Sequence, residues 1–137
     1  MIGLLILAQQ DMGKGLLSAV EHVLGRTPAQ LEAMPVNYEQ APEQISQSLQ
    51  KRIAQLDQGD GVLILADIYG ATHTNVACRF LKKNVVELIA GVNLPMLIRT
   101  LNYRHLSLEK LVEKALSGGP EGIVCAGQNP RKAEGGR

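Results

Sequence analysis

Short apolar runs alternate along this chain with segments of helical spacing, and this alternation most constrains its fold. The runs from Gly3 to Ala8, Gly61 to Ala66, Val85 to Gly91 and Gly122 to Ala126 have the length of strands and contain few polar residues. Strands buried on both faces have such a composition, which is typical of a mainly parallel sheet. A weaker strand is predicted near Leu31 to Val36.

Between these runs, apolar residues recur every three or four positions, as on the buried face of a helix. The helices predicted in this way run from Met12 to Leu24, from just after Pro42 to Leu56, from about Thr74 to Leu81 and from Leu108 to Leu116. The expected C-terminal stops of the first and last helix are Gly25 and Ser117-Gly118-Gly119-Pro120. Helix following strand so regularly predicts an α/β fold, a single doubly wound, mainly parallel open sheet with helices on both faces.

The size of the chain favours one domain. Its 137 residues, 45% of them apolar, are enough for one well-buried core and too few for two ordinary domains. We expect residues 1–127 to form that domain. Residues 128–137 are polar and carry glycine and proline, so we expect them to form a flexible C-terminal tail.

The sequence composition also indicates where the protein is located and which classes of partner are not expected. The apolar runs are far shorter than the roughly 20 residues of a membrane span, and the N-terminus lacks the positive flank and cleavage site of a signal peptide. Cys78 and Cys125 have no metal-binding spacing and are expected to be reduced thiols. A net charge of +1 and 3% aromatic residues do not favour nucleic-acid binding. We therefore expect a cytoplasmic protein with no nucleic-acid partner.

Two loops are expected to meet at one edge of the sheet, because ligands of doubly wound folds bind where loops at the carboxyl ends of strands converge. They comprise residues 8–13 and residues 67–74. The second, within the sequence DIYGATHTN, places Asp67 at a strand end, then Gly70, then Thr72 and Thr74 leading into a helix. Glycine and a helix N-terminus suit an oxyanion. A purely structural role, with Asp67 ending a strand and a threonine capping a helix, explains the same residues.

Fingerprints of other chemistries are missing from the sequence. It contains no G-x-S-x-G nucleophile elbow and neither of the glycine patterns typical of nucleotide binding. The aspartates fall on different predicted elements and the three histidines are widely spaced, so they do not form a metal-ligand set. We therefore expect no metal and no cofactor.

Three segments carry a resemblance to a known family. GKGLLSAVEHVLG, GVLILADIYGATHTNVACRF and VELIAGVNLPMLIRTLNYR occur in this order at characteristic separations. Together they resemble the enzyme IIA domain of the mannose/fructose class of the bacterial phosphotransferase system, over nearly the whole chain from Ile2 to about Ala126. Its most specific pieces are Asp67 followed by Gly70 and Asn75, and the run from Gly91 to Leu97.

This resemblance implies an activity and partners. In the family, a histidine accepts a phosphoryl group from the histidine phosphocarrier protein and passes it to enzyme IIB. The resemblance also implies a homodimer, often formed by exchange of a C-terminal strand, and contact with the membrane at most through a permease complex. The candidate phosphate-binding residues are Gly70, Thr72 and Thr74, from the chemistry of their loop, together with Asn75. The implied partner-facing residues are Asn93, Pro95, Met96, Arg104 and His105.

The family's acceptor histidine is missing from its expected position. Alignment on Gly15-Leu16-Leu17 places Gln9 at that position and Gln10 at the glycine of the family's T-H-G motif. An imidazole nitrogen offers a lone pair, whereas the lone pair of an amide nitrogen is delocalised into its carbonyl, so Gln9 cannot carry the phosphoryl group. Asp67, which orients the histidine in the family, has no imidazole beside it in the sequence.

Another histidine is a candidate substitute acceptor. His73 belongs to the same predicted crevice and stands where the family commonly has proline, although a partly exposed loop residue is the simpler interpretation. His22 lies on the first predicted helix, beside its apolar stripe, and is expected to be a surface or half-buried residue. His105 follows Arg104 in a loop, where both residues are candidates for contact with phosphate or a partner protein.

Two functional hypotheses follow from these residues. In the first, the protein is an active phosphoryl-relay component whose acceptor has moved to His73. In the second, it is a phosphorylation-incompetent relative that keeps the fold and the partner surface and acts as a regulatory or binding module. Whether it is a phosphoryl transferase is therefore left open. A deliberate exchange of histidine for Gln9 would give the same sequence.

Overall fold

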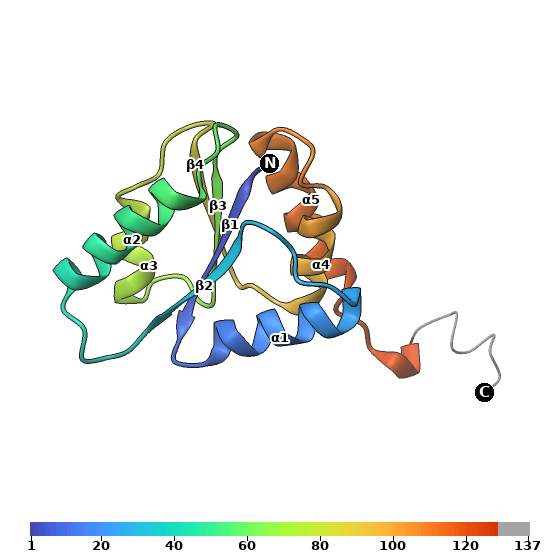
Figure 1. Cartoon of the computed structure of the whole chain (residues 1–137). Coiled ribbons are helices and arrows are strands. Elements are labelled where there is room, and N and C mark those ends of the chain that lie inside the picture. The colour runs from blue at the N-terminus through green and yellow to red at the C-terminus, as the bar shows by residue number, and fades with distance from the viewer. Residues whose placement is uncertain (129–137) are drawn as a thin grey trace.

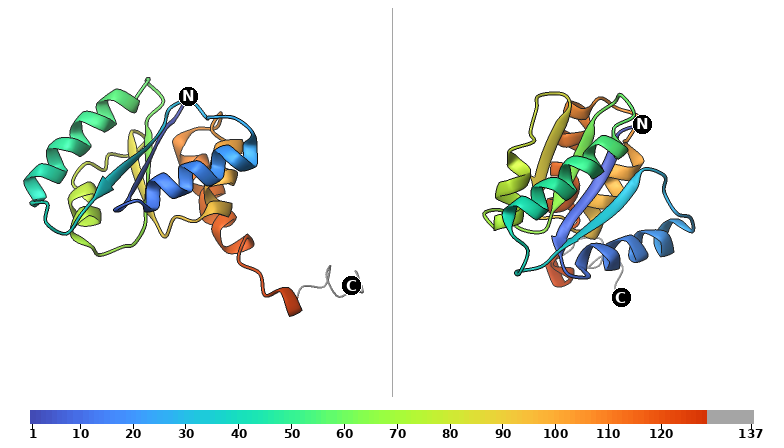
Figure 2. Two further views of the ribbon diagram at one scale, coloured as in Figure 1. Left: turned by 60° about the horizontal axis from the view of Figure 1, so that its bottom comes forward. Right: turned by 60° about the vertical axis from the view of Figure 1, so that its left-hand side comes forward.

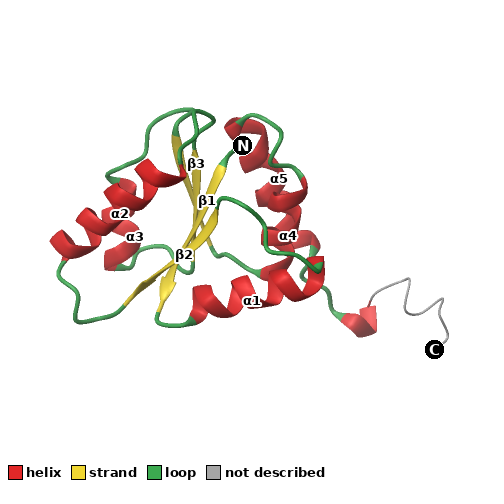
Figure 3. Ribbon diagram, in the orientation of Figure 1, coloured by secondary structure: helices red, strands yellow, loops and turns green. Residues whose placement is uncertain are grey.

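A four-stranded parallel sheet forms the centre of the molecule in the computed structural model, which describes residues 1–128. The strands are β1 (Gly3–Gln9), β2 (Leu31–Val36), β3 (Val62–Ala66) and β4 (Val86–Ala90), and their order in the sheet is β2-β1-β3-β4. All neighbouring pairs are parallel (Figure 3). The predicted doubly wound α/β sheet is confirmed, including the weaker strand at β2.

Helices cover both faces of this sheet (Figure 1). Helices α2 (Pro42–Leu56) and α3 (Thr72–Cys78) lie on one face, and α1 (Met12–Leu24), α4 (Leu94–Asn102) and α5 (Leu108–Glu121) lie on the other. The same division is visible in both turned views (Figure 2). A short 3-10 helix, Ala126–Gln128, follows at the end of the described chain.

The central strands are apolar throughout because both of their faces are buried. Alternate residues of β1 serve two separate cores: Leu4 and Ile6 pack toward α1, α4 and α5, whereas Leu5 and Leu7 pack toward α2 and α3. All four side chains are fully buried. This burial on both sides explains why β1 and β3 lack the polar alternation of a half-exposed strand.

The predicted last strand, from Gly122 to Ala126, is wrong. Helix α5 does not end at the Ser-Gly-Gly-Pro sequence but continues to Glu121, with Pro120 in its last turn. Gly118 and Gly119 are buried where α5 packs on α4, and a Cβ atom on Gly118 would lie 2.6 Å from Cδ of Arg99. These glycines allow two helices to approach closely and do not terminate one.

Two further helices differ from the prediction. Helix α4 is not among the four helices predicted from apolar spacing; Asn93 caps it by accepting a hydrogen bond from the Met96 N–H. Helix α3 spans 72–78 in place of the expected 74–81.

The domain boundary expected at residue 127 falls at the end of the described chain. Of the expected tail, only Gln128 belongs to the described residues; 129–137 lie outside them. Cys78 and Cys125 are both free thiols. Within residues 1–128, no helix is long and apolar enough to cross a membrane.

Candidate functional site

The loops that follow β1 and β3 lie side by side, as expected from strands that are neighbours in the sheet. Leu7 of β1 pairs with Ala66 of β3, so both strands end at the same edge and their next residues face one another. The backbone N–H of Gln9 donates a hydrogen bond to Oδ2 of Asp67 at 3.0 Å. The sheet therefore brings together the first two predicted site residues.

His73 completes this cluster, and its position corrects the simpler interpretation of it as a partly exposed loop residue. It lies in the first turn of α3, is only 2% exposed, and places its Nε2 2.7 Å from Oδ1 of Asp67. Asp67 therefore does have an imidazole beside it, six residues further along the chain. This pairing depends on how α3 docks on the sheet, so the sequence alone did not show it.

The carboxylate fixes the tautomer of this imidazole. Burial alone would raise the pKa of Asp67, but hydrogen bonds from His73 and from the Gln9 and Ile68 N–H groups hold it below its ordinary value of 3.8. An ionised carboxylate only accepts hydrogen bonds, so Nε2 of His73 carries a proton, and in the neutral imidazole Nδ1 keeps the lone pair.

The side chain of Gln9 closes the other side of the ring. Its Nε2 lies 3.5 Å from Nδ1 of His73, a distance that allows a weak N–H donor to face the imidazole lone pair. Its Oε1 is buried and has no hydrogen-bond partner within the described chain. Asp67 and Gln9 thus lie on either side of His73, and each ring nitrogen faces a neighbour.

Gln10 adopts a backbone conformation that favours glycine. Its φ is 50°, and its N–H donates a hydrogen bond to the Val36 carbonyl at 2.8 Å, which holds the turn after β1 in place. Residues other than glycine, asparagine and aspartate seldom occupy this left-handed backbone region without strain. The loop therefore keeps the geometry of a glycine position with a glutamine in it.

The predicted phosphate-binding residues separate into two groups. Gly70, with φ of 88°, and Thr72 are exposed beside His73, and Asn75 is exposed on α3 with its Nδ2 3.5 Å from the Gly70 carbonyl. Thr74 is fully buried, and its hydroxyl donates to the Ile68 carbonyl at 2.6 Å. That hydroxyl holds the loop after β3 and does not face solvent.

A cavity of about 330 Å³ lies against this cluster. His73 and Gln9 form part of its wall, together with the loop after β2 and the start of α3. The residues that line it are Gln9, Val36, Asn37, Tyr38, Gln40, Ile45, Gly70, Ala71, Thr72 and His73. Three βα loops therefore enclose one small cavity at the carboxyl edge of the sheet, the position at which doubly wound folds bind ligands.

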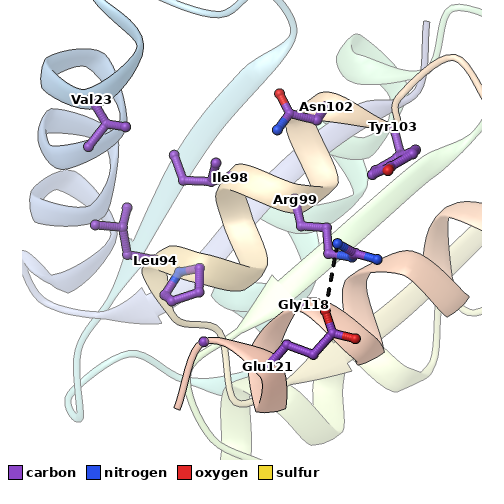
Figure 4. Close-up of a pocket in the computed structure, with 10 residues that line it drawn as sticks. Val23, Leu94, Ile98, Arg99, Asn102, Tyr103, Gly118 and Glu121 are labelled. Atoms are coloured by element: carbon purple, nitrogen blue, oxygen red, sulfur yellow. Dashed lines mark ion pairs between the residues drawn. The ribbon is translucent and has the colours of Figure 1, made fainter. Parts of the chain in front are cut away.

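The predicted partner-facing residues do not gather on one surface. Asn93 caps α4, Pro95 is exposed in its first turn, and Met96 is 5% exposed and belongs to the core beneath that helix. Pro95 borders a larger open hollow of about 570 Å³ between α1, α4 and α5, where Arg99 pairs with Glu121 at 3.7 Å (Figure 4).

Arg104 and His105 lie at the opposite end of the sheet. The Arg104 guanidinium is buried and donates hydrogen bonds to the carbonyls of Ile2, Ala29 and Gln30. Burial, and next to it the charge of Arg26, lowers the pKa of Arg104 to about 10. Ile2 precedes β1 whereas Gln9 ends it, so about 20 Å of strand separates Arg104 from the crevice. Arg104 thus links the start of β1 to the loop before β2 through hydrogen bonds. The neighbouring His105 is exposed and stacks on Tyr103.

Residues 1–128 contain no group of three or more histidine, cysteine, aspartate or glutamate side chains placed to hold a metal ion. The chemistry that the crevice offers is that of an imidazole held between a carboxylate and an amide. His73 carried a signal of this: Val76 and Ala77, three and four residues further on, are apolar, so His73 shares the buried face of α3.

Comparison with known proteins gives similar chains from sugar phosphotransferase systems. The mannose-specific EIIAB component of Escherichia coli K12 is 37% identical over 91 residues, and the fructose-specific EIIA component of Bacillus subtilis 168 is 32% identical over 91 residues. Each alignment covers 64% of this chain, but only 28% and 62% of those two proteins. The chain therefore matches less than two thirds of the length of either relative.

Solved structures show the same fold. The phosphotransferase system component EIIA from Streptococcus agalactiae has a TM-score of 0.84 at 23% identity, and the alignment covers 94% of this chain and 100% of that one. A putative sugar phosphotransferase system permease from Klebsiella pneumoniae has a TM-score of 0.77 at 26% identity, covering 92% and 91%. A family model described as the PTS system fructose IIA component matches residues 3–116, from β1 into α5. Because that match spans most of the chain and the fold agrees with it, the chain belongs to the mannose/fructose family of phosphotransferase-system enzyme IIA components.

Proposed function

We propose that this chain is an enzyme IIA-like regulatory or binding module of a sugar phosphotransferase system, and that it does not accept a phosphoryl group in its crevice. One observation carries the proposal: His73, the imidazole nearest to the expected acceptor position, is 2% exposed with Asp67 at one ring nitrogen and Gln9 at the other. A phosphoryl donor needs an open line of approach to a free nitrogen lone pair.

The chemistry of Gln9 supports the same function. The family resemblance places this residue at the acceptor position, at the carboxyl end of β1, and an amide nitrogen there has no available lone pair. Its N–H instead faces Nδ1 of His73 at 3.5 Å. The amide thus both replaces the acceptor and covers the one lone pair that His73 has left.

The surface around the crevice supports a binding role. Large apolar side chains are exposed on all three loops that surround it: Met12 at the start of α1, Tyr38 after β2, and Ile68 and Tyr69 after β3. Their exposed fractions range from 53% to 86%. Exposed apolar groups gathered at one edge are typical of protein-binding surfaces. We infer that this edge contacts the histidine phosphocarrier protein or enzyme IIB.

We also infer a homodimer, as the family resemblance implies. Ile123 and Val124, just after α5, are 78% and 57% exposed. Strand β4 forms one edge of the sheet. Burial of both features in a second copy would remove exposed apolar side chains and an open strand edge from solvent. Sedimentation at micromolar concentration should give twice the mass of the chain; the mass of a single chain would refute the dimer.

A second function, phosphoryl relay through His73, is favoured by one contact. The 2.7 Å bond between Asp67 and Nε2 orients the ring and fixes its tautomer, as carboxylates do for catalytic histidines. Relay would require the Gln9 side chain to swing away from Nδ1, so that the incoming phosphorus could reach that atom.

Phosphoryl transfer from phosphoenolpyruvate, through enzyme I and the histidine phosphocarrier protein, separates the two functions. We expect the native chain to stay unlabelled and Gln9→His to take up an acid-labile phosphate, because a histidine at that position ends β1 beside the same carboxylate. His105→Ala is the matched control, since His105 is exposed and lies at the other end of the sheet.

Labelling of the native chain that His73→Ala abolishes and His105→Ala preserves would establish relay through His73 and overturn the proposed function. Failure of Gln9→His to label while the chain stays folded would show that the crevice no longer receives the phosphocarrier protein. The partner surface proposed above would then be wrong.

A further inference from the structure

The cavity beside His73 has a lining suited to a ligand that carries no charge. Among its described lining residues, none is lysine, arginine, aspartate or glutamate. Its polar groups are instead the amides of Gln9, Asn37 and Gln40, the Thr72 hydroxyl and the His73 imidazole. An anion would find no cationic side chain in this wall.

The charges behind and beside the wall are negative. Asp67 has a lowered pKa, is therefore ionised at neutral pH, and contacts both Gln9 and His73. Glu39 is exposed on the loop between two lining residues, Tyr38 and Gln40. Like charges disfavour a phosphorylated ligand at this place.

Two of the cavity's polar groups have unused hydrogen-bonding capacity. Oε1 of Gln9 is buried and has no partner within the described chain, so its hydrogen-bonding capacity is unused; a ligand donor reaches it once the Gln9 side chain turns toward the cavity that it lines. The Thr72 side chain is exposed and lines the cavity, so its hydroxyl is accessible to a ligand. A hydroxyl group is both donor and acceptor, so a molecule rich in hydroxyls can satisfy amide and hydroxyl partners together.

Hydrogen bonds to backbone N–H groups of their own loop hold the Asn37 and Gln40 side chains in place. Oδ1 of Asn37 accepts hydrogen bonds from the N–H groups of Glu39 and Gln40, and Oε1 of Gln40 accepts from the Asn37 N–H at 3.0 Å. These contacts use only the oxygens and leave the NH₂ groups as donors. Tyr38 adds an apolar ring and a hydroxyl group to the wall.

We propose that this cavity binds a small neutral polyhydroxylated molecule, a monosaccharide or polyol, through Gln9, Thr72 and the loop after β2. Its volume of about 330 Å³ is within the range of small-molecule sites and suits a ligand of monosaccharide size. The inference rests on the proposed function, because a crevice that does not carry a phosphoryl group is free to hold another ligand.

Chemical-shift titration of the ¹⁵N-labelled full chain tests this proposal. The neutral probes are D-glucose and D-fructose, the anionic probe is D-glucose 6-phosphate and the cationic probe is D-glucosamine. We expect at least one neutral probe to bind with a millimolar dissociation constant and to shift the backbone amides of Gln9, Asn37, Gln40 and Thr72. D-Glucose 6-phosphate should bind at least about tenfold more weakly than D-glucose.

Two variants and one control establish the contacts. Gln9→Met removes the buried acceptor while keeping the length of the side chain, and Thr72→Val removes the exposed hydroxyl at nearly constant volume; each should weaken binding about tenfold. Thr72 is exposed, so Thr72→Val remains informative if Gln9→Met disturbs the fold. Thr27→Val is the matched control, because Thr27 is exposed on the loop between α1 and β2 and does not line the cavity.

Three results would overturn the proposal: no shifts with either neutral probe up to about 100 mM, shifts that neither variant alters, or preference for D-glucose 6-phosphate or D-glucosamine. The titration contains no phosphoryl donor, so it fails or succeeds independently of the labelling experiment. Labelling of the native chain would contradict the proposed function, whereas an unlabelled chain without sugar-induced shifts would contradict only this inference.

Discussion

Replacing Gln10 by glycine should make this protein more stable. Gln10 has φ of 50°, in the left-handed region, and its backbone is fixed there by the hydrogen bond to the Val36 carbonyl. A residue with a Cβ atom loses about 1–2 kcal/mol in this region. Glycine avoids that loss but gives up about 0.5–1 kcal/mol of chain entropy. The net expectation for Gln10→Gly is a gain of about 0.5–1 kcal/mol in the free energy of unfolding.

Urea denaturation followed by circular dichroism measures this gain. With a typical slope for a domain of this size, the midpoint should rise by about 0.3–0.5 M without a change in slope. Gln30→Gly is a matched control: Gln30 has φ of 52°, and its side chain makes only a 3.5 Å contact to the Leu56 carbonyl. It should give a similar gain, far from the crevice.

Loss of stability in Gln10→Gly, with a gain in Gln30→Gly, would refute this reasoning. It would mean that the Gln10 side chain stabilises the loop through contacts that outweigh its backbone strain. Equal gains in both variants would show that Gln10 is tolerated in the crevice at a cost, as expected if this position is free of the close phosphate approach that a glycine allows.

Three other predictions concern the site and the core. Asp67→Asn should lower the free energy of unfolding at neutral pH by about 1–3 kcal/mol. Folding lowers the pKa of Asp67, so the difference between the native chain and the variant should shrink as the pH falls below 3.8. Urea titrations at several pH values will measure it. Arg104→Met should cost about 2–4 kcal/mol, since three carbonyls lose a charged donor, and Arg104→Lys should recover only part of it. Gly3→Ala should lower the free energy of unfolding by about 1–3 kcal/mol, because its Cβ would lie 2.6 Å from the Leu56 carbonyl oxygen. Gly15→Ala, where the added Cβ has no neighbour within 4 Å, should instead stabilise α1 by about 0.5–1 kcal/mol. Thermal melts of both variants will show the difference.

The sheet could be predicted because its pattern is local. Each of the four strands is a short run between helical segments, and β1 and β3 are apolar because they are buried on both faces. Even β2, the edge strand with Pro35 within it, was found from its apolar residues. A parallel sheet needs no information beyond this alternation to be recognised as a class.

The C-terminal half was harder because glycine and proline have more than one role. Gly118 and Gly119 stand where a helix stop is expected, but their purpose is close packing of α5 on α4, which depends on the position of Arg99 and Met96. Pro95 in the first turn of α4, after the Asn93 cap, marks a helix start that the sequence contained.

The sequence predicted that Gln9, Asp67 and His73 share one crevice, and the structure brings them together, but the sequence did not show their contacts. Gln9, Asp67 and His73 were each candidate residues, and strand pairing explains why the first two meet. The turn of α3 that directs His73 toward Asp67 arises only when its buried face packs on the sheet. Arg104, in contrast, was expected near partners because of the family resemblance, and its three backbone carbonyl acceptors come from segments distant in the sequence.

The central claim is that both ring nitrogens of His73 are engaged, one by Asp67 and one by Gln9, so that the crevice accepts no phosphoryl group. The most direct test is to record the ¹⁵N signals of the His73 ring before and after incubation with phosphoenolpyruvate, enzyme I and the histidine phosphocarrier protein. We predict a protonated Nε2 and an unprotonated Nδ1 in both spectra. A phosphorylated ring nitrogen in the second spectrum would contradict the claim.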